Sequence, residues 1–127
     1  MHPTEYKYSK EHEWLRVDGM TASIGLTDFA QKQLGDIVFV EVVRKVGDLV
    51  EAEESFGTVE SVKAVSELFS PVTGKNVEFN TLLEEEPEAL NTDPHGTWII
   101  KIEMSDVKEL DGLLTAAQYE KYIANEA

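Results

Sequence analysis

The sequence contains no cysteine, which excludes disulfides, thiolate nucleophiles and cysteine-ligated metal sites. Positive charge is scarce: 11 Lys and Arg stand against 25 Asp and Glu, for a formal net charge of -14. Nucleic acids and anionic membranes both require a cationic face, so neither is an expected partner. No apolar run approaches the roughly 20 residues of a membrane span, and the first residues lack the regions of a signal peptide. We therefore expect a soluble protein of the cytoplasm, monomeric because its charge opposes self-association.

Several motifs that would indicate an enzyme are also missing. There is no G-x-S-x-G nucleophile elbow, no phosphate-binding loop and no G-x-G-x-x-G fingerprint, so serine-based hydrolysis and nucleotide chemistry lack support. His2, His12 and His95 are far apart, and none has a second histidine three or four positions away. We therefore expect no metal site. A small acid–base enzyme that uses Glu13 and His12 stays open, without a supporting motif.

The hydrophobic pattern predicts a mainly β protein with peripheral helices, folded as one domain over residues 1–127. Asp18-Gly19 supplies the turn of a first hairpin. The dense β-branched run at 37–43 indicates a strand covered on both faces. The expected strands are 14–17, 21–26, 37–43, 56–62, 65–69, 76–79 and 98–104.

Capping boxes predict where three helices begin, because a short polar residue is followed three positions later by Gln or Glu. The three pairs are Asp28 with Gln31, Thr81 with Glu84, and Thr115 with Gln118. The first helix, 27–34, is expected to end at Gly35. Pro87 limits the second to a turn or two. The third is the clearest and runs over about 115–124, and a further short helix is expected at 105–110.

Lys63 is the residue that we single out as a candidate functional group. It lies between two β-patterned stretches, which places it at a hairpin tip of about residues 61–65. A lysine there is solvated, nucleophilic when deprotonated, and reachable by an enzyme that docks on the turn. The ordinary interpretation is a solubilising surface lysine, but Val62, Ala64 and Val65 are unusual neighbours for an idle exposed tip.

The stretch Glu60-Ser61-Val62-Lys63-Ala64 resembles the lysine motif of glycine cleavage system H proteins, the lipoyl-carrying subunits of that system. The likeness covers nearly the whole chain, in order and at the family's spacing. The further blocks are His12-Glu13-Trp14, Gly25-Leu26-Thr27-Asp28, Gln33-Leu34-Gly35-Asp36-Ile37-Val38-Phe39-Val40, Phe56-Gly57-Thr58-Val59, Ser70-Pro71-Val72-Thr73-Gly74, Asn91-Thr92-Asp93-Pro94 and Leu110-Asp111-Gly112-Leu113-Leu114.

The resemblance implies a carrier subunit and not a free-standing enzyme, with a flattened barrel-sandwich hybrid fold of antiparallel strands and a C-terminal helix. Lys63 would hold lipoic acid as an amide, and Glu60, Ser61, Val62 and Ala64 would form the motif around it. The implied partners are glycine decarboxylase with pyridoxal phosphate, aminomethyltransferase with tetrahydrofolate, dihydrolipoamide dehydrogenase and a lipoate-attaching enzyme. The aminomethyl remnant of glycine would pass from the first partner to the second, and the third would reoxidise the dithiol.

The resemblance also implies a cleft into which the loaded arm folds back. Lysine plus lipoyl makes an arm on the order of 14 Å long, from ordinary bond lengths. Glu13 and Glu67 match the polar positions that line this cleft in the family, and a carboxylate could hold a protonated amine by a charge-assisted hydrogen bond. Arg44-Lys45 and His95 depart from the family pattern at the cleft rim and docking surface.

Other carriers and other roles stay open at this point. Biotinyl carrier domains have methionines beside their lysine, and the lipoyl domains of 2-oxoacid dehydrogenases have an aspartate before it, whereas Val62 and Ala64 are the neighbours here. Some H-like proteins donate lipoate onward to other lipoyl domains, and the sequence does not separate that role from glycine cleavage. An unmodified binding module is the remaining alternative. The resemblance favours a bacterial cytoplasmic protein.

Overall fold

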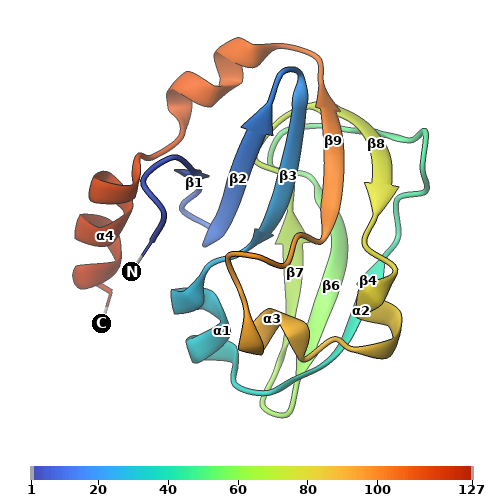
Figure 1. The fold of residues 1–127 in the computed structure, drawn as a ribbon, viewed down its shortest axis with the longest axis vertical. Helices are drawn as coiled ribbons and strands as arrows, with labels where there is room; N and C mark the ends of the chain where they lie inside the picture. The colour runs from blue at the N-terminus through green and yellow to red at the C-terminus, as the bar shows by residue number, and fades with distance from the viewer. Residues whose placement is uncertain (1, 127) are drawn as a thin grey trace.

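The computed structural model describes residues 2–126 and contains two antiparallel β-sheets with helices at their periphery (Figure 1). The strands are β1 (Lys7–Tyr8), β2 (Glu13–Asp18), β3 (Thr21–Leu26), β4 (Ile37–Val42), β5 (Leu49–Val50), β6 (Ser55–Ser61), β7 (Val65–Phe69), β8 (Gly74–Phe79) and β9 (Ile100–Met104). The helices are α1 (Asp28–Leu34), α2 (Leu82–Glu85), α3 (Ala89–Thr92), the 3-10 helix η1 (Val107–Gly112) and α4 (Ala116–Ala124). The mainly β prediction is therefore confirmed.

The larger sheet has the strand order β1-β2-β3-β9-β8-β5, and the smaller sheet has the order β4-β6-β7. Apolar side chains of both sheets meet in one main core, which removes them from water and stabilises the fold. The fully buried members of this core include Leu15, Ile24, Phe56, Leu68, Leu83, Leu90, Ile100 and Ile102. The β6–β7 hairpin projects from this body at the lower edge of Figure 1.

A second, aromatic cluster lies where α4 covers β1 and β2. Tyr8, Trp14 and Tyr119 are fully buried there, and the rings of Tyr8 and Tyr119 stack at 4.9 Å between centroids. Trp14 lies flat over Gly25 on the neighbouring strand, where a Cβ atom would come within 2.5 Å of the indole. The absence of a side chain at Gly25 is therefore what admits the tryptophan.

The helix caps follow the predictions only in part. The capping box of Thr115 and Gln118 is confirmed at the start of α4. The prediction for α1 was wrong by one residue, because Thr27 caps the helix by accepting the N–H of Ala30. At α2 the predicted capping box is absent, since Thr81 is in a helical conformation that turns its hydroxyl away from the cap position.

The prediction of a β4 covered on both faces was wrong. The strand is the edge strand of the three-stranded sheet, paired only with β6, and of its six residues only Ile37 and Val40 are buried. Val38 and Phe39 are about half exposed, at 50% and 51%. The register against β6 shifts between Ile37 and Phe39, which turns Val38 and Phe39 both outward instead of alternating them.

Three smaller differences have local causes. A register shift at β8 buries Asn76, which donates to the Arg44 carbonyl, and leaves Val77 partly exposed. The last strand begins at Ile100 and not at Trp98, whose ring packs near the aromatic cluster. The helix expected at 105–110 is a 3-10 helix over Val107–Gly112, capped by the Asp106 side chain.

Candidate functional site

A serine hydroxyl builds the turn between β6 and β7. The Ser61 hydroxyl accepts the N–H groups of Lys63 (3.2 Å) and Ala64 (3.1 Å), and it donates to the Ala64 carbonyl (3.2 Å). The Ser61 N–H also donates to that carbonyl, at 2.8 Å. Val62 and Lys63 therefore form a two-residue loop, and the amides of Lys63 and Ala64 are bonded within the turn by Ser61. The sequence pointed to the motif but not to this role of Ser61.

The turn is also tied to the rest of the protein through the loop before β4. The Val62 N–H donates to the Asp36 carbonyl at 3.0 Å. The stem of Lys63 lies beside Gly35, where a Cβ atom would be 3.4 Å from the lysine Cε. Gly35 ends α1 with a φ of 81°, a conformation that favours glycine. The exposed Lys63 side chain thus starts from a braced backbone and lies along the end of α1.

A groove of about 270 Å³ lies between α1 and β7, and Leu34, the residue before Gly35, is part of its lining. Half of its lining residues are apolar, among them Phe29 and Leu34 from the helix and Leu68 from the strand. Glu67 lies on the wall and is exposed, and Glu11, His12 and Glu126 are at the groove as well. The groove can therefore take an apolar chain, with carboxylates available for a cationic end.

Glu13 is buried, in contrast to Glu67, with 1% of its surface exposed. One of its carboxylate oxygens accepts the Phe69 N–H at 2.8 Å, and the other lies 3.0 Å from the Ser9 hydroxyl. Burial raises the pKa of Glu13 to about 8, because these two hydrogen bonds offset only part of the desolvation of the charge. The side chain is thus mostly a neutral carboxylic acid at pH 7.

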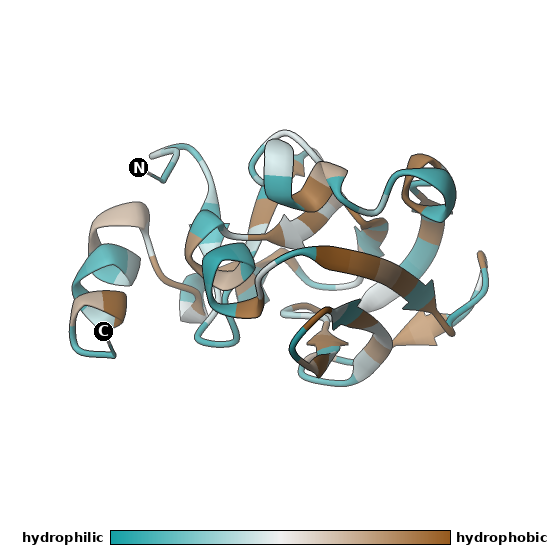
Figure 2. Cartoon of the chain, turned by 90° about the horizontal axis from the view of Figure 1, so that it is seen from below, coloured by the Kyte–Doolittle hydropathy of each residue, from teal (hydrophilic) through white to brown (hydrophobic). Residues whose placement is uncertain are grey.

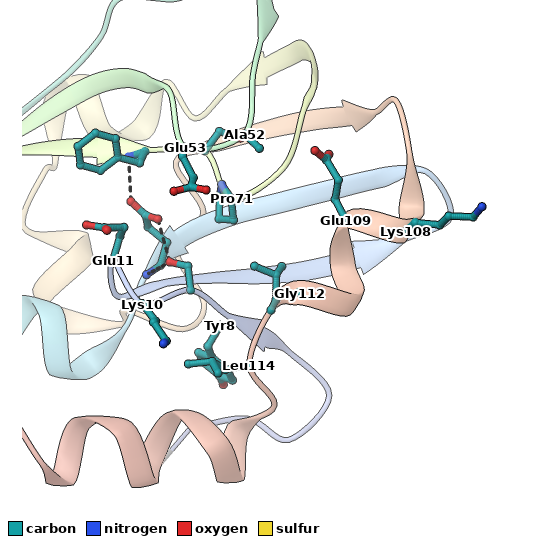
Figure 3. Close-up of a pocket in the computed structure, with 15 residues that line it drawn as sticks. Tyr8, Lys10, Glu11, Ala52, Glu53, Pro71, Lys108, Glu109, Gly112 and Leu114 are labelled. Atoms are coloured by element: carbon teal, nitrogen blue, oxygen red, sulfur yellow. Dashed lines mark hydrogen bonds between the residues drawn. The ribbon is translucent and has the colours of Figure 1, made fainter.

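Figure 3 shows a second cavity, of about 460 Å³, which Glu13 lines together with Glu11 and Glu53. The dashed lines mark the bonds from Glu13 to Phe69 and Ser9. Glu67 does not line this cavity, and Glu13 does not line the groove beside α1. The two carboxylates predicted to line one cleft therefore lie in two hollows, Glu13 in the cavity and Glu67 in the groove. The hollows are neighbours, because Glu11 lines both.

The four residues of the lysine motif lie as follows. Val62 and Ala64 are exposed on either side of Lys63, Glu60 is exposed at the end of β6, and Ser61 is buried under the turn. Glu60 pairs with Phe39 on β4 and with Val65 on β7. The motif residues therefore lie together in and next to the turn. Glu13, on β2, lies near the opposite end of β7, where it is bonded to Phe69.

Tyr119 links the C-terminal helix to α1, a connection that the sequence did not indicate. Its hydroxyl lies 2.7 Å from the Thr27 hydroxyl and 2.9 Å from Nδ1 of His12. His95 adds a second contact at the same end of α1, where its Nε2 accepts the Asp28 N–H at 3.2 Å. Burial lowers the pKa of His95, in keeping with the neutral ring that this bond requires. The N-terminal end of α1, which forms one wall of the groove, is therefore held by contacts with Tyr119 and His95.

Residues 2–126 were searched for a metal site and for a membrane-spanning helix. No group of three or more His, Asp or Glu side chains among them is placed to hold a metal ion. No helix in that range is long and apolar enough to cross a membrane.

The chain matches a family model described as "Glycine cleavage H-protein" over residues 6–126. A glycine cleavage system H protein of Anoxybacillus flavithermus is 56% identical over 122 residues, covering 95% of each chain. The H protein of Carboxydothermus hydrogenoformans is 54% identical over 125 residues, covering 98% of this chain and 95% of its own. The crystal structure of an H protein from Mycobacterium marinum superposes with a TM-score of 0.86 at 37% identity, covering 97% and 99% of the two chains.

The unclosed antiparallel sheets with a C-terminal helix are a flattened barrel-sandwich, the fold class of that crystal structure. The match over almost the whole chain then gives the family. The chain belongs to the glycine cleavage H-protein family.

Proposed function

We propose that the protein is the lipoyl-carrying shuttle of the glycine cleavage system, with lipoate joined as an amide to Nζ of Lys63. Family membership supports the role, and the observation that carries the site is the position of Lys63 in the loop between β6 and β7. Its amine is exposed, while the amides beneath it are fixed by Ser61. The relatives' names refer to the glycine cleavage system, so donation of lipoate to other proteins is not favoured.

The lipoyl group, when bound, supplies a dithiolane that accepts the aminomethyl remnant of glycine. The role of the protein chain is to present this group to the partner enzymes. A braced turn holds the attachment point, and the arm, on the order of 14 Å long, raises the local concentration of its end at a docked enzyme. The partners would be glycine decarboxylase, aminomethyltransferase and dihydrolipoamide dehydrogenase, and the protein is a carrier with no catalytic residue of its own. The named relatives are bacterial, and we place this protein in the bacterial cytoplasm.

The groove beside α1 is where the arm would rest between partners. The Lys63 stem lies next to Gly35, which follows the groove residue Leu34, so the arm could reach the groove, where Phe29, Leu34 and Leu68 offer apolar contacts. Glu67 would face a cationic end of the arm from the groove wall. Glu13 would contribute from the neighbouring cavity, where burial raises its pKa to about 8 and keeps it mostly protonated at pH 7, and a nearby cation would favour its ionised form.

Lipoylation in the presence of a lipoate-attaching enzyme, followed by glycine-dependent transfer, tests this function. Wild-type protein should gain one lipoyl group and support exchange of the glycine carboxyl group by the decarboxylase. Lys63→Arg keeps the charge but cannot form the amide, so it should gain no group and support no exchange. A modified, active Lys63→Arg variant would overturn the assignment. Lys32→Arg, which alters an exposed lysine paired with Asp28, is the matched control and should behave as wild type.

A further inference from the structure

Four exposed apolar side chains surround Lys63, and no part of the proposed arm groove uses them. Val62 and Val65 flank the turn and are 68% and 65% exposed, and Val38 and Phe39 on β4 are half exposed. We name these four residues the collar. Exposure of valine and phenylalanine side chains to water is unfavourable. A group of them beside a functional residue therefore indicates a surface that a partner covers. Figure 2, seen from below, shows the hydrophobic colouring along β4.

The strand register places two of the collar residues, Phe39 and Val65, on one face of the sheet. Phe39, Glu60 and Val65 are direct neighbours across β4, β6 and β7. Residues opposite each other on adjacent antiparallel strands share a face, with side chains about 5 Å apart. The bond from Val62 to the Asp36 carbonyl holds the tip of the turn against the start of the same edge strand.

Carboxylates lie within and around the collar, with Glu60 between Phe39 and Val65, and Lys63 lies in the turn next to it. Glu41 and Glu67 occupy the next cross-strand row on the face of Phe39 and Val65, and Asp36 and Glu60 are exposed nearer the turn. An apolar centre with an acidic border fits a partner surface with an apolar hollow and a basic border.

We propose that the collar is the recognition surface by which a lipoate-attaching enzyme selects Lys63 from the nine lysines of the chain, docking an apolar hollow bordered by Lys or Arg on it. The inference rests on the proposed attachment of lipoate to Lys63. In the attachment itself, Nζ attacks the acyl carbon of an activated lipoyl adenylate, the amide bond forms as AMP leaves, and two protons of the ammonium pass to solvent.

Lys45 shows why both the apolar centre and the acidic border are needed. It also lies between exposed valines, Val43 at 59% and Val46 at 65%. Its immediate neighbour is the cation Arg44, however, and no three-strand row of side chains stands behind it. Arg44 is itself paired with Glu54 at 3.1 Å, so the difference between the two sites lies in Glu60, Glu41 and Glu67, whose carboxylates attract a basic partner surface beside Lys63. This lysine provides an internal comparison with nearly equal exposure of its valines.

The test is the rate of lipoylation of the full chain by a purified ATP-dependent lipoate ligase, followed by intact mass at subsaturating protein. Val62→Thr/Val65→Thr keeps the β-branched shape and removes apolar surface from the collar. We expect kcat/KM for lipoylation to fall roughly tenfold. The matched control Val43→Thr/Val46→Thr makes the same change at nearly the same exposure and should leave the rate unchanged. Circular dichroism and the urea midpoint should be alike for all three proteins.

Each outcome separates the inference from the proposed function. A slow collar variant with an unchanged control supports the collar, and the same slowing should appear for Phe39→Ser. Wild-type lipoylation at Lys63 with an equal rate in the collar variant overturns the inference but leaves the function intact. Equal slowing in collar and control also overturns it, because the effect would then not be local. Failure of wild-type protein to be lipoylated contradicts the proposed function itself.

Discussion

Replacing Glu13 with Gln should stabilise the protein, and by an amount that grows with pH. Gln has the shape of the protonated carboxylic acid and cannot ionise. Its carbonyl can accept the Phe69 N–H, and its NH2 group can donate to the Ser9 hydroxyl, so both present hydrogen bonds keep a partner. The only large change is the loss of a titrating group from a site that is 1% exposed.

The magnitude follows from the pKa of Glu13, about 8 in the folded protein against the model-compound value of 4.5. Between these two values the folded state keeps a proton that the unfolded state has released. Stability that is present below pH 4.5 is therefore lost as pH rises toward 8, at about 1.4 kcal/mol per pH unit. Wild type pays this cost and Glu13→Gln does not. Their difference in free energy of unfolding should be small at pH 4.5 and reach on the order of 3 kcal/mol at pH 7.

Urea denaturation of both proteins at pH 5, 6, 7 and 8 measures this difference directly. All other titrating groups are common to the two proteins, so their contributions cancel in the comparison. Glu67→Gln is the control, because that side chain is exposed and its variant should run parallel to wild type at every pH. A stability difference between Glu13→Gln and wild type that does not change with pH would show that Glu13 is ionised in the folded protein, and the reasoning would fail.

Three further outcomes can be checked on the same protein. Tyr119→Phe removes the hydroxyl that contacts both Thr27 and His12 and should cost about 1–3 kcal/mol in urea unfolding. Tyr122→Phe should cost much less, because the Tyr122 hydroxyl is near the surface and its bond to the Lys10 carbonyl is long, at 3.4 Å. Ser61→Ala leaves two turn amides without their acceptor and should slow lipoylation while secondary structure by circular dichroism stays the same. The association rate with glycine decarboxylase should decrease as salt is raised from about 0.01 M to about 0.15 M, because the Debye length shortens from roughly 30 Å to roughly 8 Å. Stopped-flow rates that do not change over this range would mean that the net charge of -14 does not steer docking.

Local patterns in the sequence were enough for most of the β fold. Alternation and the Asp18-Gly19 turn predicted the β2–β3 hairpin, and Thr115 with Gln118 predicted the start of α4. These features depend on neighbours within a few residues, so they can be read from the chain. The coverage of β4 cannot be predicted in this way. Its apolar run indicates burial, but whether another layer packs on each face depends on the tertiary arrangement, and here Val38 and Phe39 are exposed.

The candidate site divides in the same way. Lys63 and its motif are contiguous, so the sequence reveals them together. Glu13 and Glu67 lie 54 positions apart along the chain, and their separation into two hollows follows from the bond between Glu13 and the Phe69 amide. The contact of Tyr119 with Thr27 spans an even longer stretch of chain and left no sign in the sequence. Contacts of this kind depend on tertiary packing and not on a local pattern.

The most direct measurement of the central claim is peptide mapping by tandem mass spectrometry of protein isolated after expression with its lipoate-attaching enzyme. A single lipoyl group, located on the peptide that contains Lys63 and absent from the peptides of the other eight lysines, is the predicted result. A group on another lysine, or a fully unmodified chain under conditions that lipoylate a control H protein, would contradict the account.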